Sequence, residues 1–302
     1  MHPAIVTLGL TVITIVAFAG NSLITRAALA DGHLGPEAFV VVRLGSGALV
    51  LAIIGGIKGA YIRPRRADIA GVISLFTYAA GFTFAYVSMG AALGALILFA
   101  CVQFTMSGVS ALKGQRPSHR ELLGLTVALG GLVALLTPGL KLEGAIWPVC
   151  GMALAGVAWG VYSVLGKGVT DPVARTARNF IGAAVLAAPL GIFIGEVSTT
   201  GLLLGVLSGA VTSGLGYVIW YATVPRLSMA TAGVAQLLVP AVAAVGGVIW
   251  LGEHLTTLQW VSVGVILTGI GVTVTQKRTR KTPSPALRTD DQSRAATSPD
   301  HR

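Results

Sequence analysis

The sequence predicts an all-α membrane protein. Apolar residues make up 54% of the 302 residues and charged residues only 11%, and the mean hydropathy is +0.81. A soluble domain carries about 25% charged residues, so this composition excludes an ordinary soluble fold. The 40 glycines support the same class, because small residues let membrane helices approach one another closely.

Ten segments are long and apolar enough to span a bilayer, which takes about 20 mostly apolar residues. Turn-forming pairs such as Gly35-Pro36 and Asp171-Pro172 separate several of them. Pro189 and Pro240 fall inside predicted helices, and we expect both to kink the chain. The predicted helices cover 4–29, 36–57, 68–87, 91–112, 119–137, 145–166, 172–195, 200–221, 227–250 and 257–276.

The last residues, 277–302, have a different composition, with seven basic, three acidic and almost no apolar residues. Such a segment cannot bury enough apolar surface to fold. We expect a disordered, basic cytoplasmic tail outside the helical bundle.

Basic residues predict the orientation, because cytoplasmic loops of membrane proteins are enriched in Lys and Arg. With the N-terminus inside, sixteen of the 21 basic residues fall in inner segments or the tail, and at most Arg26 and Lys141 fall in outer ones. This asymmetry predicts an N-in/C-in protein. It also explains the net charge of +10 by membrane topology, so no nucleic-acid partner is expected.

Two internal echoes divide the chain into halves. At an offset of 138 residues, Gly114 and Gly131 recur as Gly252 and Gly269, and at an offset of 141 Ser22 recurs as Ser163. The echoes fall on the first and fifth helices of each half. We therefore predict two five-helix repeats, 1–140 and 141–276.

Each repeat has an odd number of helices, so the two must enter the membrane from opposite sides. Inverted repeats are typical of secondary transporters. In such proteins the substrate site lies near the bilayer midplane between the repeats, and rocking of the halves gives alternating access.

Three stretches resemble the drug/metabolite transporter superfamily and its EamA-type exporters and permeases. They are "LGEHLTTLQWVSVGVILTGIG" at 251–271, "VVRLGSGALV" with Arg43 at the family's usual arginine, and Trp159-Gly160. The resemblance covers about 4–276, although Gln115 stands where an acidic residue is common in the family. It implies an inner-membrane carrier for amino acids or similar small metabolites, often acting in export.

Two arginines lie inside predicted helices, Arg43 and Arg178, each about seven residues from its helix start. Intramembrane charges are costly and mark function by default. We regard the two as inversion mates and as candidates for attracting a substrate carboxylate. The alternative is a structural arginine that snorkels or pairs with backbone carbonyls.

Uncharged polar and aromatic residues complete the candidate substrate site. Trp159 and Tyr162 share one helix face with Ser163, and Tyr217 shares another with Trp220 and Tyr221. An interfacial aromatic belt is the favoured interpretation of the last two, and interhelical hydrogen bonding is an equal alternative for the glutamines. The candidates are Asn21, Arg43, Tyr78, Gln103, Trp159, Tyr162, Arg178 and Gln236.

No acidic residue falls in the middle of a predicted helix, so no proton relay is expected. This favours a facilitator or exchanger over a proton-coupled antiporter or, less favoured, a channel. The chain has no nucleotide-binding P-loop, no catalytic residues, no cofactor site and no metal-ligand spacing. We therefore expect no enzyme, but a carrier whose partners are a small-molecule substrate and the lipid bilayer; the sequence does not predict its oligomeric state.

Overall fold

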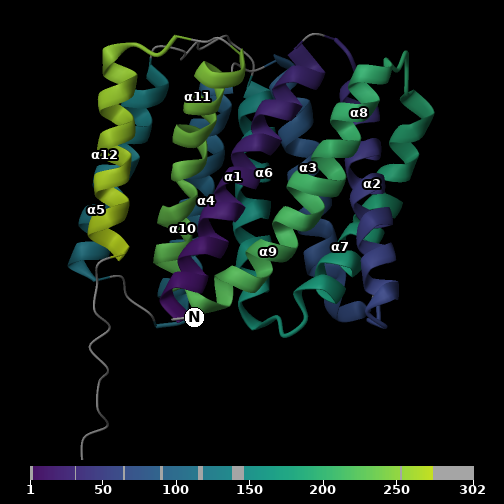
Figure 1. Ribbon diagram of the computed structural model, residues 1–302, viewed down its shortest axis with the longest axis horizontal. Coiled ribbons are helices and arrows are strands. Elements are labelled where there is room, and N and C mark those ends of the chain that lie inside the picture. The colour runs from purple at the N-terminus through teal and green to yellow at the C-terminus, as the bar shows by residue number, and fades with distance from the viewer. Residues whose placement is uncertain are drawn as a thin grey trace, which may run out of the picture.

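The computed structural model describes residues 3–30, 32–63, 65–88, 91–114, 118–137, 146–251 and 254–274. In this part of the chain the protein is a bundle of helices with no β-strand (Figure 1). The predicted tail, 277–302, lies outside the described residues, and so does Glu253 of the Gly-Glu-His segment.

Twelve α-helices form the described bundle, some of them joined end to end by short 3-10 or π segments. They are α1 (Pro3–Ala30), α2 (Pro36–Ile57), α3 (Ile69–Ser88), α4 (Ala91–Leu112), α5 (His119–Leu136), α6 (Ile146–Leu165), α7 (Pro172–Ala187), α8 (Thr199–Leu207), α9 (Gly216–Thr223), α10 (Met229–Gln236), α11 (Leu238–Leu251) and α12 (Thr257–Val274). The short segments are η1 (Arg66–Asp68), η3 (Gly166–Gly168), η4 (Ala188–Phe193), η5 (Ser208–Leu215) and η6 (Val224–Arg226).

Eight helical segments of the described chain are long and apolar enough to cross a membrane, and two shorter apolar helices accompany them, 97–112 and 257–273. Large apolar side chains also cover the outside of the bundle: Leu49 is 62% exposed, Phe104 72% and Leu203 64%. An apolar exterior of this kind fits lipid, because a water-soluble monomer exposes only small apolar patches. The protein is therefore an α-helical membrane protein.

The two predicted kinks coincide with breaks in the helices. Pro189 lies in the 3-10 segment η4, directly after α7 ends at Ala187. Pro240 lies near the start of α11, which begins two residues after α10 ends. Proline has no backbone N–H and its ring clashes with the preceding helical turn, so both breaks follow from the sequence.

Capping residues set several helix starts. Pro36 and Pro172 occupy the first position of α2 and α7, where a missing N–H costs nothing. At the start of α5 the Ser118 Oγ accepts a hydrogen bond from Glu121 N at 3.2 Å, while Glu121 Oε2 accepts one from Ser118 N at 2.8 Å.

Thr256 and Gln259 repeat this reciprocal pair before α12, at 3.3 Å and 2.9 Å. Both are capping boxes, a hydroxyl residue followed three positions later by Glu or Gln at the start of an apolar run. Gly114 has φ +74° just after α4, as expected of a helix C-terminal stop.

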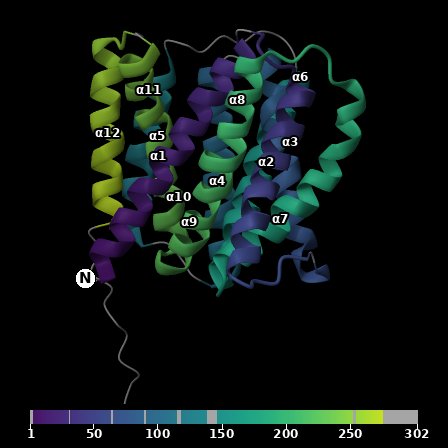
Figure 2. The same ribbon diagram turned by 45° about the vertical axis from the view of Figure 1, so that its right-hand side comes forward.

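Helices α5 and α12 pack against each other at one edge of the bundle (Figures 1 and 2). A Cβ built on Gly131 would lie 3.0 Å from the Ile266 backbone nitrogen, and one on Gly269 would lie 2.6 Å from the nitrogen of Ala128. Later residues of α5 thus face earlier residues of α12, so the pair is antiparallel. Glycine permits this approach because a side chain there would meet backbone.

The rest of the bundle surrounds α1 and α6. Helix α1 packs on α8, α9 and α11, while α6 packs on α3 and α4, and α2 packs on α7. The start of α1 and the end of α12 lie at the same face of the bundle, which we call the N face (Figure 1). The α1–α2 connection and the start of α12 lie at the opposite face.

Candidate functional site

Aromatic side chains from four helices meet in the centre of the bundle. The ring of Trp159 on α6 lies 4.8 Å from that of Tyr78 on α3, 4.6 Å from that of Tyr217 on α9 and 5.2 Å from that of Phe18 on α1, between ring centroids. All four side chains are buried. Each helix contributes one ring, so the cluster joins the two halves of the chain.

Two cavities follow one another beside this cluster. The smaller, about 20 Å³, is lined by the four rings together with Asn21. The larger, about 700 Å³, reaches from there to the α1–α2 connection and the start of α12, where Gly35 and Gln259 line it. Ser22 and Phe82 line both cavities. The volume of the larger cavity falls in the range of small-molecule sites, and it leads from the face opposite the N face toward the aromatic cluster.

Asn21 has a fixed orientation at the inner end of this path. Its Oδ1 accepts hydrogen bonds from the hydroxyls of Ser208 at 2.7 Å, Thr212 at 3.2 Å and Ser213 at 3.3 Å. Three hydroxyl donors converge on that atom, so it must be the oxygen, and the amide nitrogen points away from them. Since Asn21 lines the smaller cavity, it offers a hydrogen-bond donor there.

The three hydroxyls come from a π-helical segment, η5 (Ser208–Leu215), between α8 and α9. A π-helix is wider than an α-helix, and single π turns inside helices are frequent at functional sites. The sequence predicts one regular helix over 200–221, and these three hydroxyl residues were not among the predicted site residues. The available clue was the small polar run "SGAVTSG" inside an apolar segment.

Arg43 lies behind the tyrosines and is only 1% exposed. Its Nε donates to Ser213 Oγ at 3.0 Å and its Nη2 donates to Tyr217 Oη at 2.8 Å. The guanidinium carbon stands 5.3 Å from the ring centre of Tyr78, within cation–π range.

Within the described residues, Arg43 forms no ion pair and its Nη1 has no hydrogen-bond partner. Arg43 lines neither cavity, so its charge reaches the smaller cavity through Tyr78, Tyr217 and the Ser213–Asn21 hydrogen bond. This buried cation makes the pocket electropositive, and a carboxylate is the complementary ligand.

Of the two predicted glutamines, Gln236 bonds to other helices and Gln103 bonds within its own helix. Trp159 Nε1 donates to Gln236 Oε1 at 2.5 Å, and Gln236 Nε2 donates to Met106 Sδ at 3.4 Å. Gln103 Nε2 donates to Ser107 Oγ at 3.1 Å within α4. Neither glutamine lines either cavity, so the structure places both outside the pocket.

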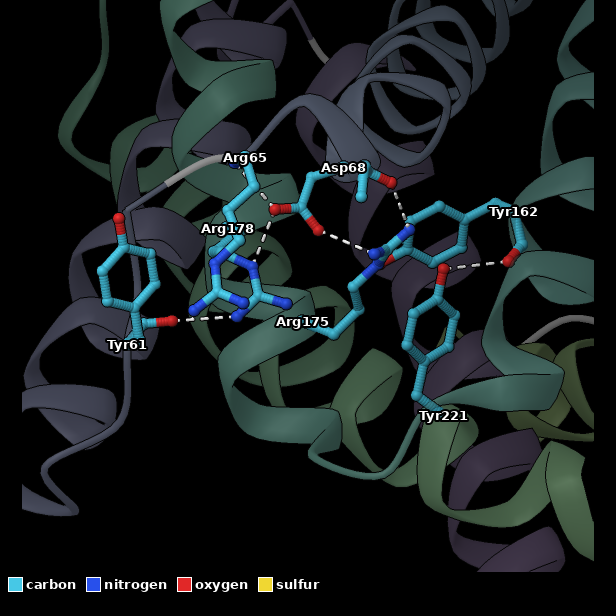
Figure 3. Close-up of polar contacts among 8 residues, drawn as sticks. Tyr61, Arg65, Asp68, Tyr162, Arg175, Arg178 and Tyr221 are labelled. Carbon is cyan, nitrogen blue, oxygen red and sulfur yellow. Dashed lines mark hydrogen bonds and ion pairs between the residues drawn. The ribbon is translucent and has the colours of Figure 1, made fainter.

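Arg178 lines neither cavity and lies beside Asp68 and Tyr61 (Figure 3). Its Nε pairs with Asp68 Oδ2 at 2.8 Å and its Nη1 donates to Tyr61 O at 2.8 Å. Asp68 also pairs with Arg175, whose Nη1 lies 2.8 Å from Oδ1.

The helix starts do not support the pairing of Arg43 with Arg178 as inversion mates. Counted from Pro36 and Pro172 at the helix starts, Arg43 corresponds to Asn179. A Cβ on Gly209 would meet the backbone oxygen of Arg43, and one on Gly71 would lie 2.6 Å from the side-chain Oδ1 of Asn179.

Tyr162 is buried next to Trp159, with 5.5 Å between ring centroids, but it does not line either cavity. The interfacial-belt interpretation of Trp220 and Tyr221 is wrong, since both are fully buried. Trp220 Nε1 donates to Ser163 Oγ at 3.0 Å, and Tyr221 Oη donates to Tyr162 O at 2.9 Å. These two hydrogen bonds connect α9 with α6 on the N-face side of the aromatic cluster.

Comparison with known proteins agrees with this architecture. The EamA-like transporter family matches residues 146–275. An uncharacterised protein of Pseudomonas aeruginosa is 44% identical over 255 residues, which span 82% of this chain and 88% of that protein. This chain belongs to the EamA-like transporter family. The resemblance to EamA-type permeases of the drug/metabolite transporter superfamily is thereby confirmed, and family membership indicates a multi-pass membrane transporter of small metabolites and not an enzyme.

Two of its relatives carry functional names. The threonine/homoserine exporter RhtA of Escherichia coli is 31% identical over 172 residues, covering 53% of this chain and 57% of RhtA. A probable terminal-alkyne amino-acid exporter of Streptantibioticus cattleyicolor is 26% identical over 290 residues, covering 90% of this chain and 96% of that protein. A solved crystal structure with 21% identity shares the fold, with a TM-score of 0.73 over 86% of this chain and 97% of the other.

Proposed function

We propose that this EamA-family protein is a secondary transporter of the inner membrane that exports amino acids or similar small carboxylates by alternating access. The observation that carries the proposal is the hydrogen-bonded chain from buried Arg43 through Ser213 to Asn21, which lines the smaller cavity next to the 700 Å³ cavity. The functional names of the amino-acid exporters among its relatives support the substrate class.

The topology that we propose has ten membrane-spanning helices in two inverted repeats, 1–140 and 141–276. In this scheme α8, η5 and α9 form one span, and α10 and α11 form another. The packing of α5 on α12 supports it, because under the 138-residue offset the contact of Gly131 with Ile266 becomes that of Gly269 with Ala128. A pair of contacts that exchange under one operation is what a two-fold axis in the membrane plane produces.

The charge asymmetry supports an N-in/C-in orientation, with the N face in the cytoplasm. The large cavity then opens to the outside, and the aromatic cluster with the α6–α9 hydrogen bonds closes the path toward the cytoplasm. We assign this conformation to the outward-facing state of an alternating-access cycle.

In the proposed substrate complex, the carboxylate of the substrate accepts a hydrogen bond from the Asn21 amide and lies in the field of Arg43. The side chain of the substrate points into the larger cavity, whose walls are largely apolar and include Leu98, Phe99 and Val239. Tyr78 and Trp159 complete the inner wall. Of the eight candidate residues, this assignment uses Asn21, Arg43, Tyr78 and Trp159 at the outward-facing pocket.

Facilitated diffusion or exchange is the coupling mode that we propose. Asp68 is the one buried acidic residue in the described part of the chain, and it is occupied by two arginines at a helix end. A free, central carboxylate is what a proton-coupled antiporter would use.

Counterflow of labelled L-threonine and L-leucine in proteoliposomes, with and without a pH gradient, tests this proposal. We expect saturable counterflow that needs no gradient, and we expect Arg43→Gln to abolish it. The lipid-facing Thr126→Val, which loses only a hydrogen bond to Leu122 O, is the matched control and should transport normally. Strict dependence on the gradient would establish the proton-coupled antiporter instead, and flux without saturation would indicate a channel.

A further inference from the structure

A second polar cluster lies buried between α6, α7 and α9, on the N-face side of the aromatic cluster. The Tyr162 hydroxyl on α6 faces the side chains of Thr176 and Asn179 on α7, and Tyr221 stacks on Tyr162 with 4.7 Å between ring centroids. All four side chains are 0% exposed. The cluster belongs to neither of the two cavities.

The polar atoms of the cluster face one another without forming hydrogen bonds of good geometry. In the described part of the chain, eight buried side-chain atoms have no hydrogen-bond partner, and five of them lie in or beside it: Tyr162 Oη, Thr176 Oγ1, Asn179 Nδ2 and Oδ1, and Arg175 Nε. Buried polar groups in folded proteins are almost always satisfied, so such a concentration calls for an explanation. A state of the protein in which water or a ligand enters the cluster provides one.

Two residues of the cluster also match two residues of the outward-facing pocket. Tyr162 corresponds to Asn21 at the 141-residue offset, and Asn179 corresponds to Arg43 when counted from the two helix-starting prolines. A glycine of the third helix in each half contacts these positions, Gly209 the backbone of Arg43 and Gly71 the side chain of Asn179. Tyr162 and Asn179 thus occupy in the second half the positions that Asn21 and Arg43 occupy in the first, but no cavity reaches them in this conformation.

The charge beside the cluster favours an anion. The carboxylate of Asp68 pairs with both Arg175 and Arg178 at 2.8 Å (Figure 3), so the three side chains together carry one net positive charge. Arg175 Nε still lacks an acceptor. Guanidinium, hydroxyl and amide donors around one position suit a carboxylate.

We infer that Tyr162, Thr176, Asn179 and Arg175 form a second carboxylate-binding site, which is closed in this conformation and opens toward the N face when the two halves exchange their accessibility. This inference rests on the proposed transport function. The substrate carboxylate binds there in the inward-facing state, as it binds near Asn21 and Arg43 in the outward-facing state.

Cysteine accessibility tests the opening. In a background with Cys101→Ala and Cys150→Ala, the variant Thr176→Cys is exposed to a membrane-impermeant maleimide in inverted vesicles, where the N face lies outside. We expect labelling, and we expect added L-threonine or L-leucine, whichever undergoes counterflow, to slow it several-fold. Ala183→Cys, equally buried on the same face of α7 two turns further on, is the control and should stay unlabelled. Absence of labelling at Thr176→Cys in protein that still performs counterflow would overturn the inference.

Sidedness of binding tests the role of the site. We expect Thr176→Val and Asn179→Leu to raise the half-saturation concentration for the same amino acid about ten-fold or more from the N-face side, in inverted vesicles. From the opposite side, in right-side-out vesicles, the change should stay within about two-fold. Equal effects from both sides, or none, would contradict a site confined to this half. If the unmodified protein shows no counterflow, it is the proposed transport function that fails, and labelling of Thr176→Cys still reports whether the cluster opens.

Discussion

The orientation of the Asn21 amide leads to a sharp prediction about substrate charge. In Asn21→Asp, a carboxylate oxygen can still accept the hydrogen bonds of Ser208, Thr212 and Ser213, so the hydroxyls keep their acceptor. The face toward the cavity changes from an N–H donor to a negatively charged oxygen. The fold should therefore survive while the binding of a carboxylate is lost.

The size of the effect follows from the distance. An introduced carboxylate at hydrogen-bonding position would stand about 4 Å from that of the substrate, where two unit charges repel by about 2–4 kcal/mol at an effective dielectric constant of 20 or somewhat more. At 1.36 kcal/mol per factor of ten, the half-saturation concentration rises by about 30- to 1,000-fold.

Asn21→Leu is the contrasting variant. It removes the acceptor, but Thr212 can still donate to Ser208 O at 3.1 Å, so the hydroxyls of Ser208 and Ser213 are the ones left without their partner. At about 0.6–1.7 kcal/mol per interhelical hydrogen bond in a membrane, the loss of stability is about 1–3 kcal/mol. Thermal unfolding in detergent should show a lower Tm for Asn21→Leu than for Asn21→Asp.

Counterflow in proteoliposomes completes the test, with the carboxylate amino acid compared with its neutral amide derivative. Asn21→Asp should lose counterflow of the carboxylate amino acid and retain more counterflow of the amide derivative. If Asn21→Asp instead transports the carboxylate with unchanged half-saturation, the amide nitrogen does not contact it and the assignment of the pocket is refuted.

Two further predictions concern the packing and the N face. Gly269→Ala should lower the Tm, because its Cβ would lie 2.6 Å from the backbone of α5. The control Gly264→Ala, on the same helix, meets nothing within 4 Å and should leave the Tm unchanged or raise it through better helix propensity. Similar Tm values for the two variants would refute the tight contact. Asp68→Asn should destabilise the protein by up to about 3 kcal/mol, since it leaves the partly buried Arg175 and Arg178 without their carboxylate partner. It should also speed maleimide labelling of Thr176→Cys from the N face; unchanged labelling would show that this ion-pair cluster does not hold the N face closed.

Much of the architecture was predictable because it depends on composition and local chemistry. Apolar segment lengths predicted the helices, and the capping boxes before α5 and α12 followed from Ser118 and Thr256 with an acceptor three residues later. Of the candidate site residues, Asn21, Tyr78 and Trp159 do line one cavity. A polar side chain in the middle of an apolar helix costs free energy unless it finds a polar partner. Such residues therefore stand out in the sequence as candidates for a shared site.

The rest depended on register and depth, which one sequence does not determine. Arg178 and Asn179 differ by one residue, or about 100° around a helix, and this difference decides which of them corresponds to Arg43 in the other half. The π turn shifts the register of α9 against α8 and brings Ser213 to Asn21. Tyr221 lies near the end of its predicted helix, and only the packing of α6 on the residues before η6 shows that it is buried.

The antiparallel α5–α12 contact is isologous in the sense used for symmetric dimers: each helix offers the other the same surface. In a single five-helix chain that paired with a copy of itself, every substitution would change both ends of that contact and both faces of the carrier together. In the proposed two-repeat scheme a fused chain is released from this constraint, and Arg43 in the first repeat corresponds to Asn179 in the second. The two proposed sites are therefore unequal and would permit different affinities at the two faces of the membrane. A carrier that, as proposed, has no energy source would in this way be tuned to the unequal concentrations on either side.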